Sequence, residues 1–152
     1  RGEASDYIKG YFRNFPGIKD YMERIKVEAR ENGFVETLFG RRIHISGFTG
    51  GNQAMRGFAE RQAINAPIQG SAADIIKRVM IRTPATLSEA GFTTKMLLQV
   101  HDELIFEGPE DEAKAATALI TDLMETAAEP VLKLAVPIVA EAGIADSWAD
   151  AH

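Results

Sequence analysis

The chain has 152 residues, of which 45% are hydrophobic, and it carries a formal net charge of -5 with no cysteine. This length and hydrophobic content suit one domain, or part of a larger one, and exclude wholesale disorder. The absence of cysteine excludes disulfides, a thiolate nucleophile and a cysteine-bound metal. No apolar run approaches about 18 residues, so we expect no segment that spans a membrane.

Charge is distributed unevenly along the chain. Residues 1–82 contain 14 Lys or Arg against 9 Asp or Glu, a balance of +5, whereas residues 83–152 contain 3 against 13, a balance of -10. The two balances together return the -5 of the whole chain. The asymmetry has two interpretations. It could arise by chance together with one acidic helix, or the protein could have a basic surface that binds a polyanion beside an acidic region.

The N-terminal residues predict two helices. Residues 3–14 are weakly amphipathic, and Pro16 can begin the next helix without losing a hydrogen bond. Apolar residues then recur at helical spacing in Ile18, Met22, Ile25 and Ala29. Gly33 is expected to end this helix, because glycine adopts the left-handed cap conformation easily.

A short hairpin and a loop are expected next. The segments 34–38 and 42–45 alternate in polarity around a turn at Gly40. The glycine-rich stretch 46–51 lacks the GK[ST] ending of a phosphate-binding loop, so that kind of nucleotide site is excluded.

Two successive helices follow this loop. Asn52 can cap the first, which runs to about Ile64 and is interrupted at Pro67 because proline has no amide hydrogen. Ser71 begins a sequence that resembles a capping box with aspartate in place of glutamate, so a new helix is expected there. Gly91 is expected to end this second helix.

The remaining residues predict a hairpin, an acidic helix and a last strand. Apolar strands at 96–100 and 104–106 flank a polar trio, and both strands are expected to be buried. A helix over 109–129 begins with three acidic residues and is expected to face solvent. Residues 136–142 predict a strand, and Trp148 is expected to be a buried plug. Together these elements indicate an α+β fold, with a small antiparallel sheet and its carboxylate-bearing hairpin packed against long helices.

The polar trio is His101, Asp102 and Glu103, and its two adjacent carboxylates have two readings. They are solvated turn residues, or they are oxygen ligands of the kind that suit Mg²⁺ or Mn²⁺. Two carboxylates cannot hold a pair of metal ions about 3.5–4 Å apart, so a further acidic ligand would have to come from elsewhere. His44 and His101 lack the spacing of a zinc site.

A second set of polar residues has the spacing of one helix face. Arg61, Asn65 and Gln69 recur every four residues, and Arg56 precedes them. Guanidinium and amide groups can donate to phosphates and to base edges, although a solvated helix face would look the same. The pair Arg41-Arg42 after the hairpin turn is a third basic element.

Several stretches resemble the family-A DNA polymerases, the DNA polymerase I type. The sequence LQVHDELIFE at 98–107 resembles their motif C, and RGFAERQAINAPIQGSAADIIK at 56–77 resembles the helix pair that precedes it. YFRNFPG at 11–17, ETLFGRR at 36–42 and GIADSW at 143–148 are similar to further stretches of the same polymerases. The resemblance implies that the whole chain is the C-terminal part of a polymerase domain, comprising the end of the fingers and part of the palm.

The resemblance also implies a role for each candidate residue. Asp102 would bridge two catalytic Mg²⁺ ions, Glu103 would be a more peripheral metal ligand, and His101 would contact the primer terminus. The residues implied to contact primer–template DNA are Arg41, Arg42, Arg56, Arg61, Asn65 and Gln69. Of these, the row from Arg61 to Gln69 would check the geometry of the nascent base pair, because minor-groove acceptors are alike in all correct pairs.

The implied function is template-directed DNA synthesis, with primer–template DNA and deoxynucleoside triphosphates as partners and with Mg²⁺, or Mn²⁺, as cofactor. A bacterial, nucleoid-associated location in the cytoplasm is expected. The family's second bridging aspartate belongs to motif A, which is absent here, as is motif B. We therefore expect the chain to be incomplete at its N-terminal side, to need that missing part as a partner, and to be inactive alone.

Two other functions stay open. The chain could be a non-catalytic DNA-binding module derived from a polymerase. It could also be a small metal-dependent phosphohydrolase that uses Asp102 and Glu103, with Asp74 or Glu107 as a third ligand. About 13 Å of strand separates Glu107 from the hairpin tip, which disfavours the phosphohydrolase.

Overall fold

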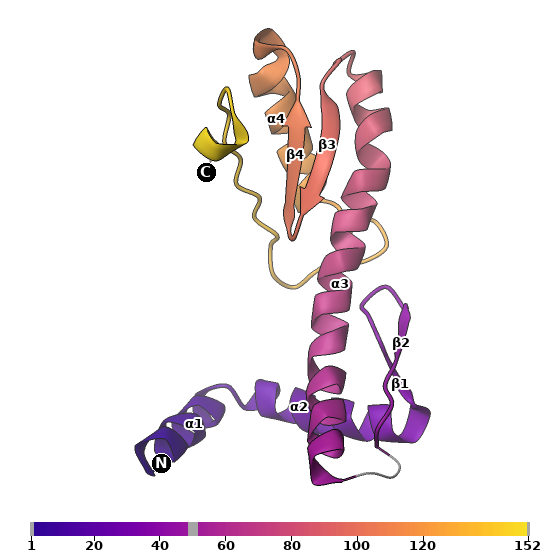
Figure 1. Ribbon diagram of the computed structural model, residues 1–152, viewed down its shortest axis with the longest axis vertical. Coiled ribbons are helices and arrows are strands. Elements are labelled where there is room, and N and C mark those ends of the chain that lie inside the picture. The colour runs from indigo at the N-terminus through magenta and orange to yellow at the C-terminus, as the bar shows by residue number, and fades with distance from the viewer. Residues whose placement is uncertain (1, 49–51, 152) are drawn as a thin grey trace. The chain divides into compact units, whose positions relative to one another are not determined.

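The computed structural model describes residues 2–48 and 52–151. The elements along the chain are α1 (Gly2–Asn14), α2 (Pro16–Asn32), β1 (Phe34–Glu36), β2 (Arg42–His44), α3 (Gln53–Glu89), β3 (Lys95–Val100), β4 (Glu103–Glu107), α4 (Glu110–Glu125) and the 3₁₀ turn η1 (Trp148–Asp150) (Figure 1). The strands form two separate two-stranded antiparallel sheets, and the predicted α+β class is confirmed. The chain divides into two compact units, residues 1–70 and 71–152. No helix within the described ranges is long and apolar enough to cross a membrane.

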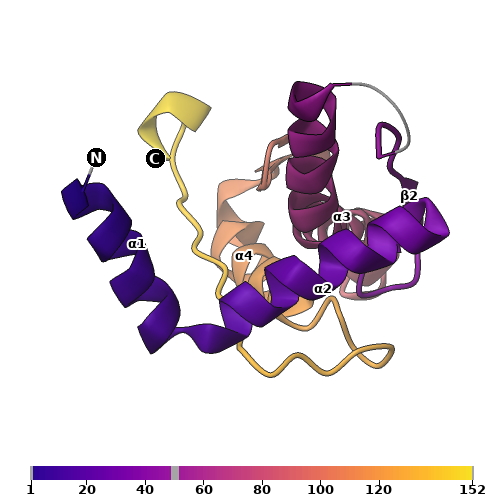
Figure 2. The same cartoon turned by 90° about the horizontal axis from the view of Figure 1, so that it is seen from below.

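The core of the first unit lies between α2, the β1–β2 hairpin and the first half of α3. Pro16 begins α2 as predicted, and the amide of Gly33, at φ = 76°, donates to the Ala29 carbonyl and ends it. Helix α2 crosses the first half of α3 (Figure 2). The buried residues that meet there are Ile25, Ala29, Val35, Ile45, Ala59 and Ala63.

The predicted hairpin of the first unit is confirmed, with shorter strands than expected. Strand β1 pairs with β2 in the register Phe34↔His44 and Glu36↔Arg42. Its turn is closed by the Thr37 amide, which donates to the Arg41 carbonyl at 2.9 Å. Residues 46–48 are loop as expected, and residues 49–51 of the glycine-rich stretch lie outside the described residues.

Helix α3 is longer than predicted. Asn52 caps it, since its side-chain oxygen accepts a hydrogen bond from the Met55 amide at 3.0 Å. The predicted interruption at Pro67 and the new start at Ser71 are wrong, because one helix runs through both residues for 37 residues. Proline removes its own amide hydrogen bond and crowds the preceding turn, but the helix continues through it, and Ser71 is buried within the helix instead of capping it. The helix ends near Gly91, as expected.

The second unit packs α4 and the β3–β4 hairpin against the second half of α3. Its core contains Leu87 from α3 with Ala116 and Ile120 from α4. Arg78 and Arg82 of α3 donate to the backbone carbonyls of Ala127 at 2.9 Å and Glu129 at 2.8 Å. These two bonds fasten the turn after α4 to helix α3.

Three expectations for this unit are wrong. The hairpin strands are only partly buried, with Leu97 50% and Leu98 54% exposed. Residues 136–142 form no strand: Pro137 has no amide hydrogen to donate, and the Ala140 amide bonds the Glu125 carboxylate instead. Trp148 is 46% exposed and is not a buried plug.

A four-bond contact joins the start of α4 to the start of β3. The Glu112 carboxylate accepts hydrogen bonds from the backbone amides of Thr93 and Thr94 at 2.8 and 3.1 Å. It also accepts from their hydroxyls at 3.0 and 3.1 Å. Loss of hydration raises the pKa of Glu112, but these hydrogen bonds outweigh it and hold the pKa below its ordinary value.

We expect Glu112→Gln to lower the melting temperature of the chain near neutral pH, because the amide replaces one acceptor oxygen with a donor. The contribution of Glu112 is complete above the ordinary glutamate pKa and is lost as pH falls through the lowered folded value. The variant should therefore lose less stability on acidification than the parent. Thermal melts across this acid range test the prediction. Glu110→Gln, in the same helical turn, is the matched control, and equal effects of the two variants would contradict it.

Candidate metal and nucleic-acid sites

The polar trio lies at the tip of the β3–β4 hairpin, as predicted. Val100 pairs with Glu103, which leaves His101 and Asp102 as a two-residue turn. His101 has φ = 55°, a conformation that non-glycine residues adopt mainly in turns. The Gln99 side chain donates to the His101 carbonyl at 2.7 Å and steadies this turn. The fold thus presents the trio at an exposed, tightly turned tip.

The tip offers carboxylate oxygens but not a complete metal site. Asp102 belongs to the turn and Glu103 to the strand, so the two side chains leave the backbone in different directions. Residues 2–48 and 52–151 contain no group of three side chains that could hold a metal ion. The donor chemistry fits Mg²⁺, which accepts one or two protein carboxylates together with water and phosphate oxygens.

The structure removes the basis for the phosphohydrolase hypothesis. Glu107 pairs with Lys95 at the end of the hairpin away from the tip. Asp74 is 9% exposed within α3 and joins no metal-binding group among the described residues. Neither residue completes a site with Asp102 and Glu103.

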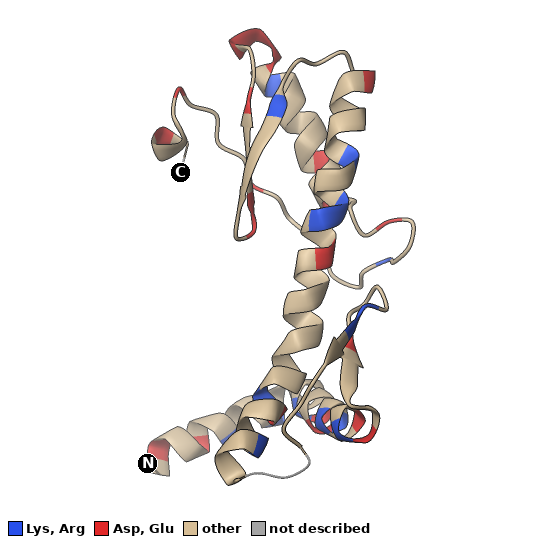
Figure 3. Ribbon diagram, turned by 45° about the vertical axis from the view of Figure 1, so that its right-hand side comes forward, with Lys and Arg blue, Asp and Glu red and all other residues tan. Residues whose placement is uncertain are grey.

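Acidic residues gather on the second unit. Figure 3 shows them at the tip of the hairpin and at the start of α4, where Glu110, Asp111 and Glu112 form the first turn. An exposed hairpin tip and a helix N-terminus that favours anions therefore contribute part of the negative balance of this part of the chain.

The second set of polar residues forms a row on α3. Arg61, Asn65 and Gln69 are all exposed, and because the helix is continuous, they share one face as their spacing predicts. The alanines that alternate with them, Ala59 and Ala63, are 0% exposed and pack in the core. The row therefore lies on the side of the helix turned away from its own unit. We call these three residues the polar row.

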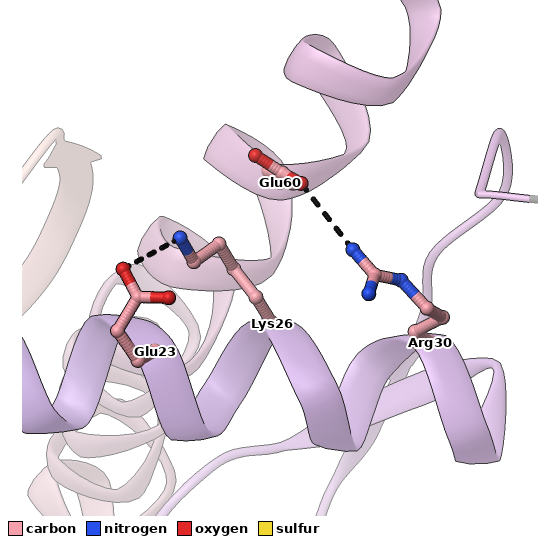
Figure 4. Close-up of polar contacts among 4 residues, drawn as sticks. All are labelled: Glu23, Lys26, Arg30 and Glu60. Atoms are coloured by element: carbon pink, nitrogen blue, oxygen red, sulfur yellow. Dashed lines mark hydrogen bonds and ion pairs between the residues drawn. The ribbon is translucent and has the colours of Figure 1, made fainter.

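Helix α2 holds α3 from the side opposite the polar row. The Tyr21 hydroxyl donates to the Ile64 carbonyl at 2.9 Å, and burial raises the pKa of this hydroxyl. Arg30 bonds the Glu60 carboxylate at 3.4 Å, while Lys26 pairs with Glu23 of its own helix (Figure 4). Because Glu60 faces Arg30, its charge is directed away from Arg61.

The adjacent residues Arg41 and Arg42 have different surroundings. Arg42 bonds the Glu36 carboxylate at 3.0 Å, and its guanidinium lies 4.5 Å from the centre of the Phe34 ring. Arg41 reaches back to α3 and donates to the Gly70 carbonyl at 3.0 Å. Arg56 is exposed in the first turns of α3. Arg41, Arg56 and the polar row all belong to the first unit, whereas the trio belongs to the second.

Sequence reasoning missed the residues that support the polar row. The sequence patterns assign no role at the row to Tyr21, Thr37 or Gly70. A glycine within a helical pattern is the one signal that could have found this contact, since glycine there costs stability unless another group needs the space.

Comparisons with known proteins cover the whole chain. The model of the family described as DNA polymerase family A matches residues 1–150. The chain is 51% identical to DNA polymerase I of Rhizobium leguminosarum over 154 residues, which covers 100% of the chain and 15% of that protein. It is 49% identical to DNA polymerase I of Pseudomonas aeruginosa, covering 100% of the chain and 16% of that protein.

A solved structure is similar throughout the chain. It is described as the POL domain of Pol1 from M. smegmatis in complex with DNA primer-template and dNTP. The TM-score is 0.91 at 40% sequence identity, over 99% of this chain and 26% of that one. The chain thus spans only a small part of each protein it matches.

Proposed function

Because the chain belongs to DNA polymerase family A, we propose that it is part of an enzyme that carries out template-directed DNA synthesis. The family match over residues 1–150 supports this proposal most strongly. The exposed acidic tip of the hairpin agrees with it. We propose that the segment contributes the end of the fingers and part of the palm. A similar solved domain is a complex with DNA primer-template and dNTP, which supports the same partners here. A cytoplasmic location at the nucleoid follows from this role.

Asp102 is proposed as a metal ligand and Glu103 as a more peripheral one. Mg²⁺ held there, together with a carboxylate from outside this chain, would supply stabilisation of the negative charge that develops on oxygen atoms during nucleotidyl transfer. Asp102 is exposed at the tip of the hairpin. His101 precedes it in the same turn and is proposed to contact the primer terminus. The remaining carboxylate would come from a part of the polymerase outside this chain.

The polar row is proposed to read the shape of the nascent base pair. Its guanidinium and amide groups can donate to minor-groove acceptors, which occupy similar positions in all correctly paired ends. Arg42 and Arg56 would act on the duplex backbone, where positive charge supplies affinity without sequence preference. Arg41, for which the family resemblance implies the same role, bonds helix α3 in this structure.

In a full-length polymerase that carries this segment, Asp102→Asn should reduce kcat by more than about a hundredfold, because a bound metal supplies several kcal/mol of transition-state stabilisation. The Kd for primer–template DNA should change little. Single-turnover primer extension and equilibrium DNA binding measure the two effects. Glu107→Gln, at the other end of the same hairpin, is the control. A kcat that survives within about tenfold would refute the metal role.

Arg61→Ala and Gln69→Ala should weaken discrimination between matched and mismatched primer ends more than they weaken bulk DNA affinity. Each removes a donor aimed at a minor-groove acceptor, and a correct pair loses that bond whereas a mismatched pair does not. Extension from both kinds of primer end, with kcat/KM measured for each, gives the ratio. Equal losses on the two ends would show that these residues supply affinity only.

The isolated 152-residue chain should show no nucleotidyl transfer, because the described residues hold no group of three metal ligands. A primer-extension assay with Mg²⁺ or Mn²⁺ tests this, and metal-dependent extension would contradict it. The same incomplete carboxylate set favours one alternative, a non-catalytic DNA-binding module derived from a polymerase. That alternative requires salt-dependent duplex binding and no activity even when the chain is part of a complete polymerase.

A further inference from the structure

We propose that Arg41 and Gly70 are positioning residues for the polar row, and that Arg41 acts through helix α3 rather than on the DNA backbone. The inference rests on the proposed function of the row. It starts from the contact between the β1–β2 hairpin and the helix at the end of the first unit.

Gly70 is the point of closest approach between the hairpin and α3. A β-carbon at this position would lie 2.7 Å from the Thr37 Cγ2 atom, 2.8 Å from the Ile43 Cδ1 atom and 3.2 Å from the Arg41 Nη2 atom. The first two distances are too short for a real β-carbon, so a side chain at residue 70 would have to displace the hairpin side chains packed against it. The Ile43 and Arg41 ends can turn aside, whereas Thr37 is short and buried, so the glycine allows the hairpin to lie this close to the helix.

Arg41 bonds the helix at the same point. Its Nη2 atom donates to the Gly70 carbonyl at 3.0 Å. The backbone of Arg41 is itself fixed, because its amide donates to the Thr37 hydroxyl at 3.1 Å and its carbonyl accepts from the Thr37 amide at 2.9 Å. Thr37 is 5% exposed. A fixed backbone at one end and a helix carbonyl at the other make the Arg41 side chain a brace between hairpin and helix.

The brace acts one residue from Gln69, the last member of the polar row. Gly70 faces the hairpin, and Gln69, about 100° around the helix, is exposed. The backbone of this turn is thus held on one side while Gln69 projects on another. A small movement of the turn would displace the Gln69 amide, and a misplacement of about 1 Å can cost up to about a hundredfold in rate.

Arg42 supplies the contrast. Its guanidinium contacts the Glu36 carboxylate and the Phe34 ring, both of which belong to strand β1 of the same hairpin. A residue that binds the duplex backbone from there would contribute to affinity and to its salt dependence. Two neighbouring arginines would therefore have separable effects.

The test uses a full-length polymerase carrying this segment, with four measurements: matched extension, mismatched extension, duplex affinity against salt, and amide hydrogen exchange of residues 65–70. Arg41→Ala should lower discrimination by about tenfold, quicken exchange and leave the salt slope unchanged. Arg42→Ala should instead make the salt slope shallower by about 1.

The double variant tests whether Arg41 acts through Gln69. Gln69→Ala combined with Arg41→Ala should discriminate between matched and mismatched primer ends no worse than Gln69→Ala alone. Additive losses, or an Arg41→Ala variant that behaves like Arg42→Ala, would overturn the proposal.

Gly70→Ala tests the same contact from the other side. It should reproduce the loss of discrimination, and Thr37→Ser combined with Ile43→Val should partly restore it, because these changes delete the Cγ2 and Cδ1 atoms that the new β-carbon would meet and keep the hydroxyl that accepts from the Arg41 amide. No rescue would count against the proposal. If the parent enzyme fails to extend primers, the proposed function fails instead. Hydrogen exchange then still decides, since unchanged exchange in Arg41→Ala would overturn the brace.

Discussion

Small residues on one side of α3 determine how the first unit is built. Ala59, Ala63 and Gly70 present little or no side chain, so α2 and the β1–β2 hairpin can approach the helix closely. Larger residues such as Ile25 and Val35 are then buried against a helix surface with few projecting side chains. Close packing of this kind tolerates little change in the volume of the buried side chains. The position of the polar row on the exposed side of α3 depends on this packing, because the packing fixes the helix that carries the row.

Hydrogen bonds to helix carbonyls complete this attachment. Tyr21 and Arg41 each donate to a carbonyl of α3, at Ile64 and Gly70. A carbonyl has two lone pairs, so it can accept such a bond in addition to the one within its helix. In the second unit the donors lie on the helix instead: Arg78 and Arg82 of α3 donate to backbone carbonyls of the turn after α4 and so attach that turn to the helix. Long polar side chains thus substitute for a thick apolar core in a chain of this size.

Local patterns in the sequence predicted the elements well and their continuity poorly. The cap at Asn52, the stop at Gly33 and the hairpin tip at Asp102 each depend on a few neighbouring residues, and the structure has all three. The break predicted at Pro67 did not occur, because the packing of the surrounding turns outweighs one missing hydrogen bond. Leu97 and Val136 are exposed, although the sequence pattern predicted that both would lie in strands and that Leu97 would be buried. Alternating apolar residues predict that a face will be covered, but not whether the covering residues belong to the same chain.

The separation of packing and polar faces on α3 has a consequence for evolution and engineering. Arg61, Asn65 and Gln69 lie on the exposed face, whereas the residues that hold the helix lie on the buried one. Surface substitutions away from packed groups usually change stability by less than about 0.5 kcal/mol. Substitutions in the polar row would therefore change function with little effect on the stability of the scaffold. Substrate tolerance could drift, or be redesigned, while the buried face stays under strict constraint.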